Sequence, residues 1–264
     1  MDILLHVLVA ALYLVAAWLC RPRGETPAAV RSLAIGVALA VHAIVMTRVI
    51  VRPDGLDLSF VNALSLVAGL AVLVAWVSGA LRILPGVAMM ILPVAALCAA
   101  LPTLARMPHP FAYADEPLAA AHISVALIAY ALFVVAAMQA AVLTGVEKRL
   151  HRGAPPIGAQ EPPPLLTLER YLFRLIAIGF VLLTITLISG FLFSEELFGK
   201  PVTLTHKNVF SVAGWLTFAA LLFGRWRYGW RGRAALKWIV AGTILLVLGY
   251  LGSKFVLEVL LHRA

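Results

Sequence analysis

The sequence predicts an all-α, polytopic membrane protein of about eight transmembrane helices, and two observations carry this prediction. Of its 264 residues, 63% are hydrophobic and 12% are charged, whereas a soluble domain carries roughly a quarter charged residues. The apolar residues also fall into runs of about 20, which is the length that a helix needs to cross a bilayer. These runs are apolar on every side, as helices surrounded by lipid are.

Eight apolar stretches are expected to form the transmembrane helices. They cover residues 3–20, 32–51, 59–79, 83–103, 118–145, 171–193, 207–224 and 236–260. The first stretch resembles a signal peptide in length, but it lacks a basic start and a small-x-small cleavage site, so we expect a retained helix. The spans use most of the chain, so we expect a single membrane domain over 1–264.

A proline-rich segment at 146–169 is expected to divide the bundle. Its two proline clusters, at 155–156 and 162–164, resist helix formation and favour an extended linker. Helices 1–5 would then occupy 1–145, and helices 6–8 would occupy 170–264.

The basic residues indicate an orientation. Lys and Arg are roughly twice as frequent in one set of loops as in the other, which by the positive-inside rule places the linker inside and both termini outside. The run at 225–233 mixes arginines with aromatic residues and is expected to anchor the inner surface, a ligand site there being the alternative. The net charge of +9 is distributed as interfacial anchors, so no nucleic-acid partner is expected.

His42 is the first candidate site residue, because it lies inside the second apolar span. Ionisable groups within a bilayer are costly and often functional. One interpretation is a hydrogen bond that packs two helices together, and the other is a ligand to haem iron or another metal.

Three further histidines are predicted to lie at one level near the outer surface. His122 opens the fifth span with Tyr130 on about the same face, His206 opens the seventh span, and His262 follows the eighth. Each alone is compatible with an ordinary interfacial histidine. Together they could supply axial ligands to a haem or ligands to a divalent metal.

No set of residues typical of an enzyme active site is recognisable in the sequence. It contains no nucleophile–base pair and no phosphate-binding loop, so we expect a non-enzymatic protein. The spans hold almost no Asp or Glu, which argues against a proton-coupled pump.

Several ordered motifs resemble the CcsA/CcmC cytochrome c assembly family, in its short HemX/YpjD-like branch. His42 is followed by a Ser-x-x-Asn segment at 59–62, and His122 begins a His-Ile-Ser-Val…Tyr-Ala helix. A Leu-Glu-Arg segment at 168–170 and a Gly-Trp-Arg-Gly-Arg segment at 229–233 follow in the order that the family shows.

The resemblance implies a haem-handling protein of the bacterial cytoplasmic (inner) membrane, with haem as its cofactor and other cytochrome c assembly or membrane proteins as partners. It also implies roles for three histidines. By position, His122 matches the first outer haem histidine, His42 the intramembrane histidine, and His262 a second outer histidine.

The sequence departs from the family in two places. The stretch at 198–207 lacks the tryptophans of the haem-presenting segment, and Phe223-Gly224 stands where a second intramembrane histidine is expected. Two rival interpretations therefore stay open. The chain could be an accessory or regulatory subunit that binds a partner membrane protein without haem, or a transporter of a small solute or cation.

Overall fold

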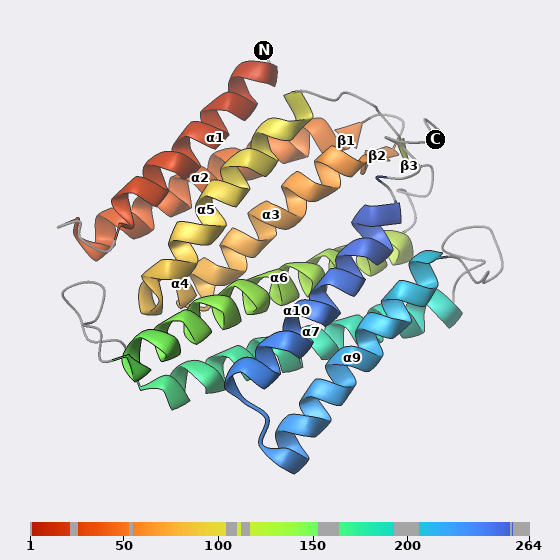
Figure 1. Cartoon of the computed structure of the whole chain (residues 1–264). Coiled ribbons are helices and arrows are strands. Elements are labelled where there is room, and N and C mark those ends of the chain that lie inside the picture. The colour runs from red at the N-terminus through yellow and green to blue at the C-terminus, as the bar shows by residue number, and fades with distance from the viewer. Residues whose placement is uncertain are drawn as a thin grey trace.

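The computed structural model describes residues 2–21, 26–52, 55–103, 110–111, 117–152, 164–192, 206–253 and 255, and in these it is a bundle of long helices (Figure 1). In chain order the elements are α1 (Asp2–Leu19), α2 (Ala28–Ile50), β1 (Val51–Arg52), β2 (Gly55–Asp57), α3 (Phe60–Val77), α4 (Ala80–Ile83), α5 (Pro85–Ala100), the 3₁₀ turn η1 (Leu101–Thr103), β3 (Pro110–Phe111), α6 (Pro117–His151), α7 (Leu165–Leu192), α9 (His206–Tyr228), α10 (Gly232–Val247) and the π-helical turn η2 (Leu248–Gly252).

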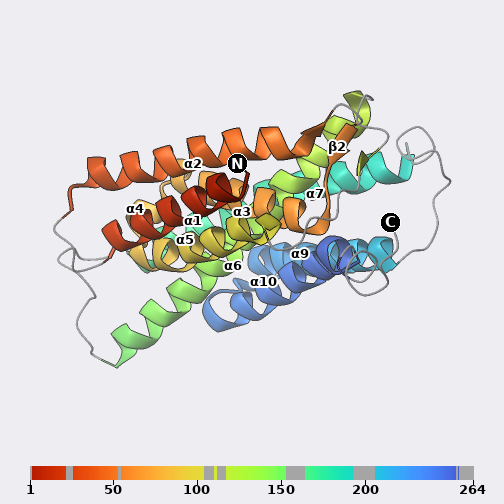
Figure 2. The same cartoon turned by 90° about the horizontal axis from the view of Figure 1, so that it is seen from above.

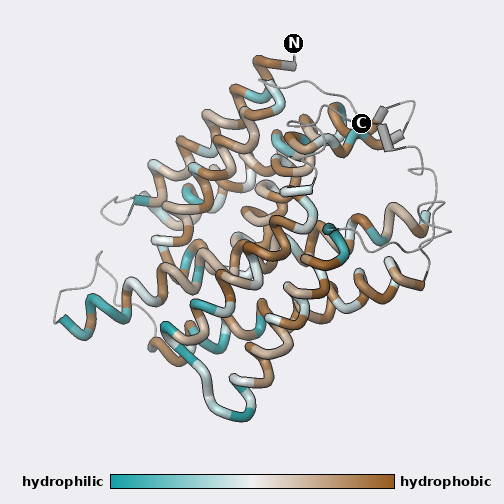
Figure 3. The backbone as a smooth tube through the Cα atoms, turned by 45° about the vertical axis from the view of Figure 1, so that its right-hand side comes forward, coloured by the Kyte–Doolittle hydropathy of each residue, from teal (hydrophilic) through white to brown (hydrophobic). Residues whose placement is uncertain are grey.

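Length and composition make these helices membrane-spanning. Among the described residues, seven helices are long and apolar enough to cross a bilayer, and α1 is apolar but shorter. Large apolar side chains point away from the bundle: Leu4, Val77 and Leu192 are each more than 70% exposed. Figure 3 shows apolar residues along the helix bodies and hydrophilic ones mostly towards the helix ends. The prediction of a polytopic helical membrane protein is confirmed.

Helix α6 lies between two groups of helices. On one side α3 and α5 pack against it, and α1 and α2 lie beyond them. On the other side α7 and α10 pack against it, with α9 against both of these (Figures 1 and 2). Because α6 contacts both groups, it fixes how the two halves of the bundle meet.

Aromatic stacking and glycines bring the second group close to α6. Phe133 of α6 stacks on Phe218 of α9 with ring centroids 3.9 Å apart, and both rings are buried. Gly179 of α7 lies against Phe133, where a Cβ would come within 3.2 Å of the ring, and Gly242 of α10 lies against Phe218 in the same way. Small residues of this kind allow close helix packing in lipid.

The two ends of the bundle differ in chemistry. One end carries a small antiparallel sheet of order β1-β2-β3, and we refer to it as the sheet end. The opposite end carries Arg82, Lys148, Arg149, Arg225 and Arg227 at or near the helix termini, and we refer to it as the Arg-rich end. Which end faces the cytoplasm stays a prediction.

The helix boundaries differ from the predicted ones around the linker. Helix α6 continues to His151 because Glu147, Lys148 and Arg149 are good helix formers that can reach water. Helix α7 starts at Leu165, directly after Pro164, whose carbonyl accepts the first helical hydrogen bonds. The helices thus enter both ends of the predicted linker 146–169, and residues 153–163 lie outside the described part of the chain. The single-domain organisation stays a prediction.

The predicted fourth span, 83–103, corresponds to one span at Pro85–Thr103, formed by α5 and η1. Pro85 begins α5, and Leu84 before it has φ −128° and ψ 88°, because the residue before a proline is driven out of the helical region. The preceding residues form the separate one-turn helix α4. Within α5, Pro93 is accommodated without ending the helix.

Candidate functional site

A buried stripe on α1, which includes two polar residues, helps to build the first candidate site. His6, Val9, Tyr13, Ala16 and Cys20 are all buried, and their spacing of three or four residues places them on one face of the helix. This face packs against α5 and α2. Two titratable side chains, those of His6 and Tyr13, are thereby enclosed between helices.

His42 is held by two hydroxyl groups from neighbouring helices. Its Nδ1 lies 2.8 Å from the Tyr13 hydroxyl of α1, and its Nε2 lies 3.0 Å from Ser65 Oγ of α3. All three side chains are almost completely buried. The hydrogen bonds that link α1, α2 and α3 satisfy both ring nitrogens, as a buried imidazole requires.

Glycine makes the space for this imidazole. A Cβ at Gly69 of α3 would lie only 2.8 Å from His42 Nδ1, so the ring occupies the position that a larger residue would take. The Tyr13 ring meets the His42 ring edge-on, with centroids 5.5 Å apart and an interplanar angle of 83°. The imidazole is therefore fixed in orientation as well as in position.

The hydroxyl partners permit either neutral tautomer of His42. Tyrosine and serine hydroxyls both donate and accept hydrogen bonds, so a proton on Nδ1 or on Nε2 is equally well matched. With the proton on Nδ1, the Tyr13 hydroxyl oxygen accepts the hydrogen bond from Nδ1–H. Nε2 then presents its lone pair to whichever group replaces the Ser65 hydroxyl. The arrangement is thus compatible with ligation of a metal through Nε2.

His6 is a further buried histidine in this half of the molecule. Its Nδ1 lies 2.9 Å from the carbonyl oxygen of Ala99 on α5, and the side chain is only 3% exposed. Its burial follows from the α1 stripe that it shares with Tyr13.

His122 forms the second candidate site, between α6 and α7. Its Nδ1 lies 2.7 Å from Ser189 Oγ, and a Cβ at Gly190 would lie 3.3 Å from its Cε1. The imidazole is half-buried. As at His42, a hydroxyl on a neighbouring helix holds Nδ1 and a glycine leaves room for the ring.

Two tyrosines and a lysine from α6, η2 and α9 lie close together. The buried ring of Tyr130 is 5.8 Å from that of Tyr250, and Lys207 Nζ lies 5.7 Å from the centre of the Tyr250 ring. Tyr250 belongs to η2, and π-helical turns often occur at functional sites.

The other two predicted site histidines are His206 and His262. His206 is the first residue of α9 and its side chain is exposed. His262 lies outside the described residues. Within the described ranges, no three or more His, Cys, Asp or Glu side chains are grouped to hold a metal ion. A shared site for His122, His206 and His262 stays a prediction.

His42 and His122 occupy different halves of the bundle but similar depths. Along its helix, His42 lies about 12 Å from the end of α2 at Ile50, and His122 lies about 8 Å from the start of α6 at Pro117. Both of these helix ends lie at the sheet end of the bundle (Figure 1). The structure therefore shows two separate imidazole sites near one surface.

The sequence did not reveal the partners of these histidines. Tyr13, Ser65 and Ser189 carry the contacts to the two imidazoles, yet tyrosine and serine are ordinary residues in a transmembrane helix. The available signals were the α1 spacing that joins Tyr13 to His6 and the glycines at positions 69 and 190.

The chain was then compared with known proteins. The model of the cytochrome c assembly protein family matches residues 32–261. The inner membrane protein YpjD of Escherichia coli K12 is 36% identical over 139 residues, which cover 53% of this chain and 52% of that protein. The matched region spans about half the length of this relative.

Matches to proteins named cytochrome c biogenesis protein CcsA are shorter. The one from Nostoc punctiforme is 32% identical over 111 residues, which cover 42% of this chain and 31% of that protein. The one from Prochlorococcus marinus MIT 9303 is 35% identical over 85 residues, covering 32% of this chain and 27% of that protein. No solved structure matches the chain. Because the family model matches most of the chain, from the second helix to the C-terminal region, the protein belongs to the cytochrome c assembly protein family.

Proposed function

We propose that the protein is a non-enzymatic haem-handling component of cytochrome c biogenesis in the bacterial inner membrane, and that it binds or presents haem near the outer face. Family membership supports the biogenesis role. The observation that carries the haem proposal is that both His42 and His122 are held at Nδ1 by a hydroxyl and packed against a glycine.

The chemistry of these side chains fits haem. Iron in haem proteins is commonly ligated by imidazole, and a ligating histidine usually has its other ring nitrogen hydrogen-bonded by the protein. Tyr13 serves His42 in this way, and Ser189 serves His122. The apolar helix surfaces nearby would accept the porphyrin faces.

The test is an absorption spectrum of the protein purified from haem-replete cells. We expect a Soret band in the wild type, and a weakened or shifted band in His122→Ala and in His42→Ala. His206→Ala tests the exposed third candidate in the same way. The matched control is His151→Ala, because His151 is exposed at the Arg-rich end and, among the described residues, is hydrogen-bonded to the Glu147 carbonyl of its own helix. The proposal would be contradicted if the wild type showed no Soret band, or if none of the variants changed that band.

A second candidate function is a haem-free accessory or regulatory subunit. The observation that favours it is that both ring nitrogens of His42 already have partners within the chain. Co-purification of one stoichiometric membrane protein with no cofactor would support this alternative. The proposal of a small-solute or cation transporter has no comparable support among the described residues.

A further inference from the structure

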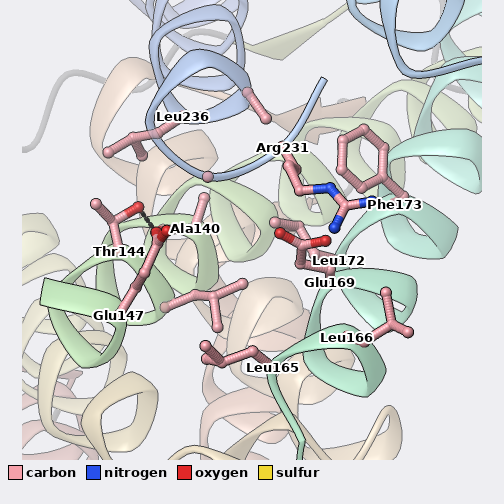
Figure 4. Close-up of a pocket in the computed structure, with 13 residues that line it drawn as sticks. Ala140, Thr144, Glu147, Leu165, Leu166, Glu169, Leu172, Phe173, Arg231 and Leu236 are labelled. Carbon is pink, nitrogen blue, oxygen red and sulfur yellow. Dashed lines mark hydrogen bonds between the residues drawn. The ribbon is translucent and has the colours of Figure 1, made fainter. Parts of the chain in front are cut away.

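A cavity of about 320 Å³ lies between α6, α7 and the start of α10, at the Arg-rich end (Figure 4). Its walls are mainly apolar, and Leu143, Leu172 and Phe173 are among them. Three charged residues also line it, namely Glu147 of α6, Glu169 of α7 and Arg231 before α10. The cavity therefore combines an apolar wall with charges of both signs.

Glu169 lines this cavity, and one of its carboxylate oxygens is unsatisfied. Its Oε2 is buried and has no hydrogen-bond partner among the described residues. Arg225 Nη1 lies 3.6 Å away, within ion-pair range but too far for a hydrogen bond. The same Nη1 donates to the Trp230 carbonyl at 3.1 Å, and the guanidinium lies over the Phe173 ring. Arg225 is thus shared between this ion pair and the Trp230 carbonyl, and Glu169 Oε2 lacks a hydrogen-bond donor among the described residues.

Glu147 also lines the cavity, with its carboxylate against Gly232. This glycine has φ +57°, a left-handed conformation that favours glycine, and a Cβ there would lie 3.2 Å from Glu147 Oε2. In Figure 4, Glu147 and Glu169 come from two different helices, and Arg231 extends towards Glu169 and Phe173. A ligand in the cavity would meet two carboxylates and one guanidinium.

The cavity lies at the depth of lipid headgroups. From Glu169 to the far end of α7 at Leu192 is about 35 Å along the helix, slightly more than the roughly 30 Å hydrocarbon core. Nearby, Trp230 stacks on Trp238 with ring centroids 5.3 Å apart, and Trp226 is 81% exposed. Aromatic side chains of this kind mark the membrane interface.

We propose that this cavity binds a phospholipid whose headgroup joins a phosphate to a primary ammonium, as in phosphatidylethanolamine. The ammonium donates hydrogen bonds to the carboxylates of Glu147 and Glu169, the phosphate pairs with Arg231, and an acyl chain lies along Leu172 and Phe173. An anionic headgroup without an ammonium would face both carboxylates, and a quaternary ammonium has no N–H to donate. The site is independent of haem binding.

The test compares three lipids that share the same acyl chains and differ in headgroup. Native mass spectrometry of the purified full-length protein would measure binding of phosphatidylethanolamine, phosphatidylcholine and phosphatidylglycerol. Because hydrogen bonds to charged groups are among the strong ones, we expect phosphatidylethanolamine to bind about tenfold more tightly than either of the others. Equal binding of all three lipids overturns the proposal.

Two isosteric variants locate the site. Glu147→Gln and Glu169→Gln should each remove most of the preference for the primary ammonium. Arg233→Gln and Lys148→Gln are the matched controls, because both residues are exposed neighbours that do not line the cavity. If Glu169→Gln fails to fold, Glu147→Gln decides alone. A preference that persists in Glu147→Gln, or that is lost equally in the controls, also overturns the proposal.

Discussion

At the scale of single residues, His42 and His122 are held in the same way although they lie in different halves of the bundle. Each imidazole has Nδ1 beside a hydroxyl from another helix, and each packs against a glycine. The hydroxyl fixes the ring, while the glycine provides the volume. Both features are needed to keep a polar ring in a fixed place within an apolar helix bundle.

The Tyr13 hydroxyl should contribute to stability. Tyr13→Phe keeps the ring but leaves His42 Nδ1 without its partner, so we expect a loss of about 0.5–2 kcal/mol in unfolding free energy. Unfolding in detergent, followed by circular dichroism, measures it. Tyr171→Phe is the matched control, because Tyr171 is exposed on α7. Equal stability of the two variants would show that the Tyr13–His42 hydrogen bond contributes nothing.

Gly69 should be intolerant of a single added methyl group. In Gly69→Ala the new Cβ would lie 2.8 Å from His42 Nδ1, and the displaced ring should cost about 1–3 kcal/mol in stability. Gly145→Ala on α6 is the control, since a Cβ there meets nothing within 4 Å. That variant should be neutral or stabilised by up to about 1 kcal/mol. Thermal unfolding of both proteins checks this, and a harmless Gly69→Ala would refute the tight packing.

The sequence identified His42 and His122 because an ionisable side chain within an apolar span stands out. It could not identify Tyr13, Ser65 or Ser189, because their importance arises only when helices far apart in the chain are placed side by side.

At the scale of elements, α6 organises the molecule. It packs against α3 and α5 on one side and α7 and α10 on the other. It also carries His122 at the sheet end and Glu147 at the Arg-rich end. The Ser189–His122 hydrogen bond joins α6 to α7, so a change in how these helices pack would move the His122 imidazole.

Ser189→Ala should alter the His122 site without unfolding the protein. The hydroxyl that holds Nδ1 at 2.7 Å would be lost, so we expect the part of the haem spectrum that depends on His122 to shift or weaken. Ser124→Ala is the control, because the Ser124 hydroxyl is exposed and bonds only the Ala120 carbonyl of its own helix. A spectrum that responds equally to both variants would argue against Ser189 as the positioning residue.

The sequence predicted the long apolar helices well because their composition is uniform. The predicted helix boundaries were inexact where a proline or a charged run departs from the apolar pattern. Pro85 separates α4 from α5, and Glu147 to Arg149 extend α6 past the apolar run. The strands β1 to β3 are two or three residues long, which is too short for an alternating pattern to reveal.

At the scale of the whole molecule, the bundle has two chemically distinct ends. The sheet end lies near both imidazole sites, and the Arg-rich end contains the amphipathic cavity. In the predicted orientation, the Arg-rich end faces the cytoplasm, since positive charges are retained on that side. The histidines then face the outer surface, where haem would be presented.

Cysteine labelling tests this orientation. The native Cys20 and Cys98 are buried, so the unaltered protein should react little with a membrane-impermeant maleimide. We expect Leu118→Cys at the sheet end to react in intact spheroplasts, and Arg227→Cys to react only after the membrane is opened. The reverse pattern would invert the orientation.

His42 and His122 are the proposed haem ligands at two separate sites, and haem content per chain tests this proposal most directly. The pyridine haemochrome assay on purified protein should give near-stoichiometric haem in the wild type and in the His151→Ala control. It should give little haem in the double variant His42→Ala/His122→Ala. A double variant that folds and retains wild-type haem content, or a wild type that contains none, would contradict the account.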